Sequence, residues 1–308
     1  MNAVCVFPGQ GSQYVGMGKE FYQHVSGVEQ LFERASSILN MDMCRLCFED
    51  PDQILGQTEF VQPAITVINL ACLLAAREAG IIPVAVAGHS LGEYVALFCA
   101  RAFSFEDTLR LVRRRGILMQ EAASLYPGGM VAVMGLDIER CQELCEQACE
   151  VGSVEIANHN SPRQVILSGE KEALRLASSY AKKAGAKLVV PLKVSGPWHS
   201  RFMQHASEEM KQALAACPPK TPEIPVVSNV TGKRYETAEQ VQHCLVQQMI
   251  RPVQWTSSIE RLIQEGHRVF VEMGPGRVLS GLIRDISKDV TVMNVERIDD
   301  LRKIRAVG

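Results

Sequence analysis

The chain has 308 residues, of which 47% are hydrophobic and 21% are charged, and its formal net charge is −2. These proportions are typical of a globular protein with a sizeable core, and they argue against a surface that binds nucleic acid. The longest apolar run, residues 64–76, contains Asn69 and is shorter than the roughly 20 residues that span a bilayer. The N-terminal residues lack the pattern of a secretory signal, so we expect a cytoplasmic protein without a membrane partner.

Ten cysteines occur in the chain, and in a cytosolic protein of this length we expect reduced thiols. Three of them, Cys141, Cys145 and Cys149, recur at four-residue spacing, which places them along one face of a helix. A metal site is one interpretation, but the segment has no C-x-x-C pair and no nearby histidine. We therefore predict small apolar residues that face a core, and no bound metal.

The N-terminal part of the chain alternates strands and helices. Residues 2–7 (NAVCVF) predict a buried strand, followed by a glycine-rich turn and a helix that begins near Gly16. Residues 84–90 (VAVAGHS) repeat this order and lead into a helix over residues 91–102. Such alternation predicts a parallel sheet that is covered by helices on both faces.

The pattern changes near residue 125. A strand, a helix, two paired strands, a helix and a strand are predicted, in that order, over residues 128–136, 137–150, 154–169, 170–186 and 187–194. This order predicts a small ferredoxin-like α+β subdomain over residues 125–194, inserted into a large domain made of residues 1–124 and 195–308. Two later apolar segments, residues 225–230 and 267–276, are expected to return to the main sheet.

Ser90 lies within a G-x-S-x-G pattern formed with Gly88 and Gly92. Such a pattern makes a sharp strand-to-helix turn, because glycines permit a crowding of the backbone that a Cβ would block. The serine hydroxyl is then held above a helix N-terminus whose free N–H groups can bind an oxyanion. The bare pattern is only moderate evidence, because chance alone produces it in some chains. Its place between a predicted strand and helix is what favours a nucleophile over a purely structural turn.

A serine nucleophile needs a base, and the chain has seven histidines. His89 adjoins the serine, and neighbouring side chains point in different directions. His159 and His199 both follow apolar strands, and Gly196 and Pro197 form a turn that can present His199 rigidly. We therefore predict His199 as the base, with His159 in reserve. The remaining histidines have polar or helical surroundings and are His24, His205, His243 and His267.

One arginine falls on the apolar face of a predicted helix over residues 105–124. The apolar stripe at helical spacing consists of Leu111, Val112, Leu118, Met119 and Ala122. Arg115 lies in the middle of this stripe, whereas Arg110, Arg113 and Arg114 lie outside it. An unpaired guanidinium in a core is costly, so Arg115 should meet a carboxylate. Either the protein supplies that carboxylate or the substrate does, in which case the site selects an acyl chain with a free carboxyl group.

Several segments together resemble one known family. They are FPGQGSQ, TEFVQPA, AGHSLGEY, RRRGILMQEA, ANHNSP, SGPWHS, SNVTG, QQMIRPVQW and EMGPGRVL. Malonyl-CoA:acyl carrier protein transacylases and the acyltransferase domains of polyketide synthases contain similar segments in this order, and the resemblance runs from Val4 to about Ile286. It implies an α/β fold with an α/β-hydrolase-like large domain, a parallel central sheet and an inserted ferredoxin-like subdomain.

The resemblance also implies roles for individual residues. Ser90 matches the nucleophile and His199 the general base of a Ser-His dyad, and Arg115 matches the arginine that binds the malonyl carboxylate. The main chain of Gln248 would orient the histidine. The remaining matches are the oxyanion-hole amides of Gln10 and Leu91 and the pocket residues Trp198, His89 and Asn160.

By this resemblance the enzyme moves a malonyl group from malonyl-CoA to Ser90 and then to the phosphopantetheine thiol of an acyl carrier protein. No metal or redox cofactor is implied, and a monomer is expected. Trp198 occupies a position where malonyl-selective members often have phenylalanine or serine, so it either narrows the pocket against a branched acyl group or indicates an unusual extender unit. The alternatives are an editing acyl hydrolase, which should lack Arg115, and a non-catalytic docking module. Fatty acid and polyketide synthesis both remain open.

Overall fold

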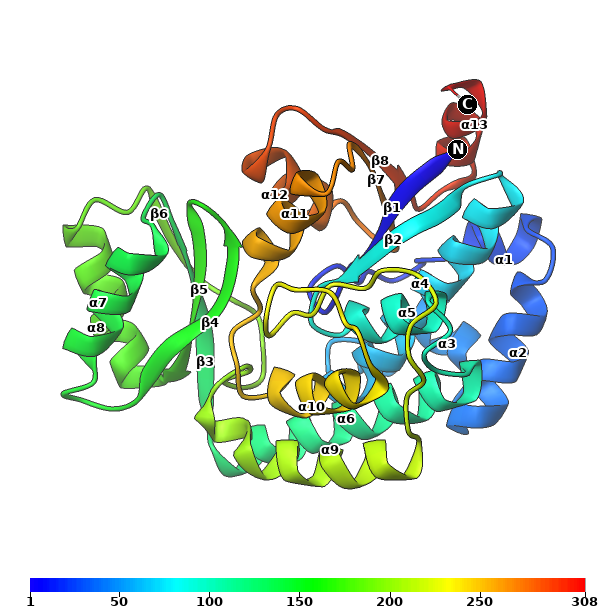
Figure 1. Cartoon of the computed structure of the whole chain (residues 1–308). Helices are drawn as coiled ribbons and strands as arrows, with labels where there is room; N and C mark the ends of the chain where they lie inside the picture. The colour runs from blue at the N-terminus through cyan, green and yellow to red at the C-terminus, as the bar shows by residue number, and fades with distance from the viewer. Residues whose placement is uncertain (308) are drawn as a thin grey trace.

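The computed structural model describes residues 1–307, and two separate β-sheets organise it (Figure 1). Sheet A is parallel throughout and has the strand order β2-β1-β7-β8. Its strands are β1 (Asn2–Phe7), β2 (Ile82–Gly88), β7 (Val269–Met273) and β8 (Thr291–Val295). The predicted parallel sheet is confirmed, and β8 is an additional edge strand that the sequence pattern does not predict.

Helices cover sheet A on both faces. The helices that begin outside residues 125–194 are α1 (Lys19–His24), α2 (Val28–Leu39), α3 (Met43–Phe48), α4 (Thr58–Glu78), α5 (Gly92–Cys99), α6 (Phe105–Leu125), the 3-10 helix η1 (Arg201–Met203), α9 (Gln204–Ala216), α10 (Ala238–Gln248), α11 (Trp255–Gln264), α12 (Val278–Ile286) and α13 (Ile298–Val307). In Figure 1, α11 and α12 lie on one side of β1 and β2, and α4 and α5 lie on the other.

Strand β1 contributes to two hydrophobic cores because its side chains alternate between the two faces of the sheet. Val4 and Val6 pack in one cluster with apolar residues of α11 and α12. Cys5 and Phe7 pack in a larger cluster with residues of α4, α5 and α6. A strand that is apolar at successive positions is therefore buried at the centre of the layered α/β arrangement, and its C-terminal end leads directly to the candidate site.

Helix α4 is long and apolar enough, by length and composition alone, to cross a membrane. The helix has 21 residues and is longer than the apolar run 64–76, because it begins at Thr58 and ends at Glu78. The polar residues Thr58 and Gln62 in its first turns are fully buried. Within its most apolar window, 83% of the residues are buried inside the protein. Helix α4 packs against α6 and so has the environment of a core helix.

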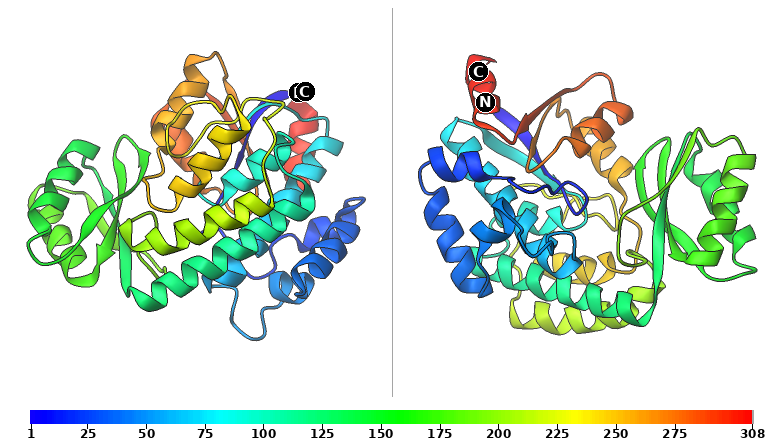
Figure 2. Two further views of the ribbon diagram at one scale, coloured as in Figure 1. Left: turned by 60° about the horizontal axis from the view of Figure 1, so that its bottom comes forward. Right: turned by 180° about the vertical axis from the view of Figure 1, so that it is seen from behind.

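Sheet B is antiparallel and has the strand order β4-β5-β3-β6. Its elements are β3 (Gly128–Met134), α7 (Ile138–Ala148), β4 (Val154–Ser161), β5 (Gln164–Glu170), α8 (Lys171–Lys183) and β6 (Leu188–Pro191). The chain order β-α-β-β-α-β, with the first and third strands in the centre, is the predicted ferredoxin-like arrangement. Both helices cover the same face and share a separate hydrophobic core, on the side turned away from sheet A (Figure 2).

The two sheets also divide the sequence between them. Every strand of sheet B falls within residues 125–194, and every strand of sheet A falls outside that range. The domain boundaries themselves, at residues 124/125 and 194/195, stay a prediction.

Two predicted elements differ from the structure. Residues 225–230 form no extended strand, and Val226 makes only an isolated parallel bridge to Val86 at the edge of β2. Pro225 has no N–H group to extend such a ladder. The helix expected from Gly16 begins at Lys19, after a series of turns.

The prediction for the three spaced cysteines is correct for two of them. Cys141 and Cys145 are buried in α7 and belong to the core of sheet B. Cys149 is exposed because α7 ends at Ala148 and Cys149 forms its C-cap. Within residues 1–307, no group of three or more His, Cys, Asp or Glu side chains is arranged to hold a metal ion.

Candidate active site

Ser90 lies at the tip of a sharp turn between β2 and α5. Its φ of 51° is in the left-handed region, which is strained for a residue other than glycine. A Cβ on Gly88 would lie 2.0 Å from the carbonyl carbon of Gly92, and a Cβ on Gly92 would lie 2.0 Å from the carbonyl oxygen of Phe7. Only glycines fit at both positions, and the turn they permit presents Ser90 beside the end of β1.

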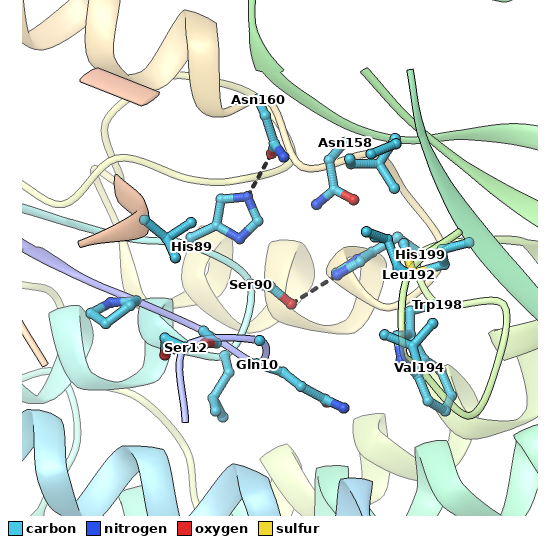
Figure 3. A pocket seen from close by; sticks show the side chains of 18 of the residues that line it. Gln10, Ser12, His89, Ser90, Asn158, Asn160, Leu192, Val194, Trp198 and His199 are labelled. Carbon is cyan, nitrogen blue, oxygen red and sulfur yellow. Dashed lines mark hydrogen bonds between the residues drawn. The ribbon is translucent and has the colours of Figure 1, made fainter. Parts of the chain in front are cut away.

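His199 is the histidine that meets this serine. Its Nε2 lies 2.8 Å from Ser90 Oγ (Figure 3). Its Nδ1 lies 2.7 Å from the main-chain oxygen of Gln248. A carbonyl oxygen only accepts hydrogen bonds, so Nδ1 carries the proton and Nε2 is left free to accept from the serine hydroxyl. Burial, together with the charge of Arg115, lowers the pKa of His199 to about 3. The imidazole is therefore neutral at pH 7, as a base must be.

His159, the reserve candidate, is not brought to the serine. It lies in β4, where its main-chain N–H donates to the carbonyl oxygen of Val253. Within residues 1–307, its side chain makes no hydrogen bond to Ser90 and does not line the cavity around that residue. The geometry thus pairs Ser90 with His199.

Gln10 and Leu91 lie on the two loops that meet at the serine. Leu91 is the N-cap of α5, so its N–H is among the free donors at the start of that helix. Gln10 follows β1 in a loop that touches the turn at Ser90, since a Cβ on Gly9 would lie 2.5 Å from the carbonyl oxygen of His89. Both residues line the same cavity as Ser90, and their role as oxyanion-hole amides stays a prediction.

Arg115 is buried in α6, with a relative exposure of 1%, and faces Ser90. Its Nη2 donates to Ser90 Oγ and to Gln248 Oε1, each at 3.0 Å, and its Nη1 donates to Gln62 Oε1 at 2.8 Å. None of these partners is an acid, and within residues 1–307 the guanidinium makes no ion pair. The prediction that Arg115 faces the interior is confirmed, and within residues 1–307 no internal carboxylate contacts its guanidinium directly.

The neighbouring arginines, unlike Arg115, lie close to acidic side chains. Arg113 pairs with Glu59 at 3.3 Å, and Arg114 pairs with Glu209 at 3.0 Å, both at the partly exposed side of α6. Arg110 lies 3.8 Å from an acid on the same helix. The helical spacing therefore separates one interior arginine from three at the surface.

A cavity of about 550 Å³ surrounds these groups between the two sheets. Among its lining residues are the predicted pocket residues Trp198, His89 and Asn160. The His89 Nε2 lies 2.8 Å from Asn160 Oδ1, so this histidine is held away from the serine (Figure 3). Trp198 is buried and lies beside His199 at the opposite wall.

Sequence reasoning missed three polar residues that hold the site together. Gln62 binds Arg115, Asn229 accepts a hydrogen bond from the main-chain N–H of Ser90 at 2.6 Å, and Glu93 binds both Asn229 and Gln248. Each lies within one of the segments that carry the family resemblance, TEFVQPA, SNVTG or AGHSLGEY. The sequence alone does not show that a polar side chain in such a segment is buried.

Known proteins are similar to this chain in sequence and in fold. Residues 4–303 match the acyl transferase domain family. The malonyl CoA-acyl carrier protein transacylase of Bacillus subtilis is 41% identical over 298 residues, which cover 96% of this chain and 94% of that protein. The polyketide biosynthesis malonyl CoA-acyl carrier protein transacylase PksC of the same organism is 44% identical over 290 residues, which cover 94% of this chain and 98% of that protein.

Solved structures agree with these matches. The malonyl CoA-acyl carrier protein transacylase of Clostridium perfringens has a TM-score of 0.95 at 40% identity, covering 100% of this chain and 97% of that one. A malonyl-transacylase solved in complex with a type II PKS acyl-carrier protein has a TM-score of 0.95 at 38% identity, covering 100% of both chains. This chain therefore belongs to the malonyl-CoA:acyl carrier protein transacylase family of acyltransferases.

Proposed function

We propose that this protein transfers a malonyl group from malonyl-CoA to the phosphopantetheine thiol of an acyl carrier protein, through an ester on Ser90. One observation carries the proposal. A buried guanidinium, Arg115, lies 3.0 Å from the serine hydroxyl and has only neutral partners. A buried cation without an acid is costly unless a ligand supplies one, and the terminal carboxylate of a malonyl group would do so beside the reacting atom.

In the first half-reaction, His199 Nε2 takes the proton of Ser90 Oγ, and the oxygen attacks the thioester carbonyl carbon. The main-chain N–H groups of Gln10 and Leu91 hold the resulting oxyanion. The carbon–sulfur bond then breaks, and coenzyme A leaves as a thiol with the proton from His199. The carbonyl oxygen of Gln248, 2.7 Å from Nδ1, stabilises the imidazolium that forms in between.

In the second half-reaction, the phosphopantetheine thiol gives its proton to His199, and its sulfur attacks the ester carbonyl. The ester carbon–oxygen bond breaks, and Ser90 recovers its proton from the imidazole. The two half-reactions exchange one thioester for another without a change in oxidation state. The proposed reaction thus involves no redox cofactor and no metal.

Two residues are proposed to select the acyl group. Arg115 favours an acyl chain that ends in a carboxylate. Trp198 reduces the space beside the serine and is proposed to disfavour a branch on the carbon next to the thioester, whereas a preference for a substituted malonyl unit is the alternative. The cavity of about 550 Å³ is much larger than a malonyl group and is proposed to admit the pantetheine arm that coenzyme A and the carrier protein share.

The experiment is intact-mass measurement of the protein after incubation with malonyl-CoA, methylmalonyl-CoA and acetyl-CoA in competition. The proposal predicts a malonyl adduct, no adduct on the Ser90→Ala variant, and transfer from the wild type to a holo carrier protein. An adduct that persists on the Ser90→Ala variant would identify a different nucleophile. Release of free acid from acetyl-carrier protein faster than malonyl transfer would instead establish an editing hydrolase.

One relative of this chain is named as a polyketide biosynthesis enzyme, and another is named as a malonyl CoA-acyl carrier protein transacylase without a pathway. Offloading to carriers of fatty acid and polyketide synthesis, compared at equal concentration, decides between the pathways. We further propose that the enzyme acts as a monomer in the cytoplasm, which gel filtration and cell fractionation test.

A further inference from the structure

A buried carboxylate with no part in the proposed chemistry lies three residues after the nucleophile. Glu93, in the first turn of α5, is fully buried. Its Oε1 accepts from the hydroxyl of Tyr235 at 2.7 Å and from the main-chain N–H of Asn229 at 3.0 Å. Its Oε2 accepts from Nε2 of Gln248 at 2.5 Å. Three donors from segments distant in sequence thus converge on one acid.

The contact with Gln248 determines which way that side-chain amide points. Its Nε2 donates to Glu93 and, at 2.9 Å, to the main-chain oxygen of Ser90, while its Oε1 accepts from Arg115 Nη2 at 3.0 Å. Reversing the amide would set its oxygen against a carboxylate and a carbonyl, and its N–H groups against a guanidinium. The carboxylate therefore keeps an acceptor, rather than a donor, aimed at Arg115.

The contact with Asn229 holds the turn at the nucleophile. Asn229 Oδ1 accepts from the N–H of Ser90 at 2.6 Å, and Nδ2 donates to the carbonyl oxygen of Gly88 at 2.6 Å. Because Ser90 has a strained φ of 51°, such bonds are needed to maintain its conformation. Glu93 thus reaches the nucleophile through Asn229 and the arginine through Gln248.

We propose that Glu93 is a positioning residue for substrate selection: acting through the amide of Gln248, it keeps the Arg115 guanidinium beside Ser90 and available to the substrate carboxylate. This inference rests on the proposed function. A direct ion pair between Glu93 and Arg115 would satisfy the cation internally and compete with the substrate. With one amide between them, the acid supports the arginine without occupying it.

The charges of Glu93 and Arg115 stabilise one another. Burial raises the pKa of Glu93 to about 7. The hydrogen bonds from Tyr235, Gln248 and Asn229 and the charge of Arg115 act in the opposite direction and lower this pKa. Burial lowers the pKa of Arg115, whereas Tyr94 and Glu93 raise it. Each group therefore reduces the desolvation penalty of the other, at a separation that leaves the guanidinium free of an acid.

The test is Glu93→Gln, with kcat/KM for Ser90 acylation measured for malonyl-CoA and for acetyl-CoA, which has no terminal carboxylate. With its oxygen kept on the two donors that Glu93 Oε1 binds, Tyr235 and the Asn229 N–H group, the new amide presents an N–H group to Gln248 Nε2, so the Gln248 side chain must reverse or lose its partner. We expect the malonyl-to-acetyl ratio to fall about tenfold, the equivalent of one hydrogen bond to a charged group, mainly through a higher KM for malonyl-CoA.

The matched control is Glu272→Gln. Glu272, in β7, is also fully buried and also accepts three hydrogen bonds, from the main-chain N–H groups of Leu279 and Ser280 and from Asn294. Within residues 1–307, no hydrogen bond or ion pair joins it to Arg115. This variant should lower the melting temperature while keeping the wild-type malonyl-to-acetyl ratio. Equal losses for both donors in Glu93→Gln would show that Glu93 is merely structural and would overturn the inference.

A second variant, Gln248→Met, removes the side-chain amide and keeps the main-chain oxygen that binds His199. It should reproduce the fall in the ratio, and adding Glu93→Gln to it should cause no further fall, since the link is already broken. If Glu93→Gln does not fold, Gln248→Met alone tests the inference. A wild-type malonyl-to-acetyl ratio in Gln248→Met would show that the Gln248 amide does not connect Glu93 to Arg115 and would overturn the inference. A wild type without any preference for malonyl-CoA would contradict the proposed function itself. A preference that depends on Arg115 but not on Glu93 would contradict only the present inference.

Discussion

Replacing Arg115 with alanine is the most direct test of how the site chooses its substrate. The variant loses the hydrogen bonds to Gln62, Gln248 and Ser90 and opens space where the guanidinium was. A malonyl group that still entered would bring a carboxylate into a buried site without a counter-ion. Leaving one member of a buried charge pair alone costs about 3–5 kcal/mol, which corresponds to a loss of about 100- to 5,000-fold in kcat/KM.

Acetyl transfer should respond in another way. An acetyl group has no carboxylate to lose, so its kcat/KM should fall by less than about tenfold or rise as space becomes available. The assay is the release of coenzyme A from each donor during a single turnover, with the adduct on Ser90 confirmed by mass. Arg114→Ala is the matched control, because Arg114 is on the same helix but pairs with Glu209 at the surface, and surface pairs contribute little.

The result that refutes this reasoning is an equal loss for both donors. It would mean that Arg115 holds Ser90 and Gln248 in place and does not bind the acyl group. A melting temperature for Arg115→Ala close to that of Arg114→Ala would establish that the comparison is between folded proteins. A large fall in the malonyl-to-acetyl ratio in the folded variant supports a substrate carboxylate at this position.

Three further outcomes are expected. Acylation by acetyl-CoA should not fall between about pH 8 and pH 5, because the pKa of His199 is lowered to about 3; a half-maximal rate near the ordinary histidine pKa of about 6.5 in the pH profile would contradict this. Gly92→Ala should reduce soluble yield and serine labelling, since the new Cβ would lie 2.0 Å from the last carbonyl oxygen of β1; normal labelling and melting would contradict it. Trp198→Ala should increase labelling by methylmalonyl-CoA relative to malonyl-CoA, and an unchanged ratio by mass would show that the indole does not limit branching.

Local patterns predict those parts of the fold where each residue's surroundings follow from its neighbours in sequence. The strands predicted at residues 2–7 and from residue 84 are apolar at successive positions and lead into tight turns that contain glycine. The interior position of Arg115 follows from helical spacing alone, because the stripe around it is buried. In these cases the physical cause is local.

The parts that were missed depend on contacts between distant segments. Strand β8 has only one fully buried residue, Val295, and lies at a sheet edge, so its pattern is weak. Asn229 lies 139 positions from Ser90, to which it is hydrogen-bonded, and Gln62 lies 53 positions from Arg115. Asparagine and glutamine are ordinarily surface residues, and only the folded chain shows that these two are buried partners of the site.

Gln248 gives neutral hydrogen-bond acceptors to both His199 and Arg115. In a serine hydrolase triad a carboxylate binds the Nδ1 proton of the histidine. Here Gln248 supplies two neutral acceptors instead, a main-chain oxygen for His199 and a side-chain oxygen for Arg115. A carboxylate in place of this glutamine side chain would face the guanidinium directly, at low local dielectric, and would pair with it. The arginine would then have no free charge for a substrate, so the proposed selection of an acyl carboxylate requires a neutral side chain at position 248.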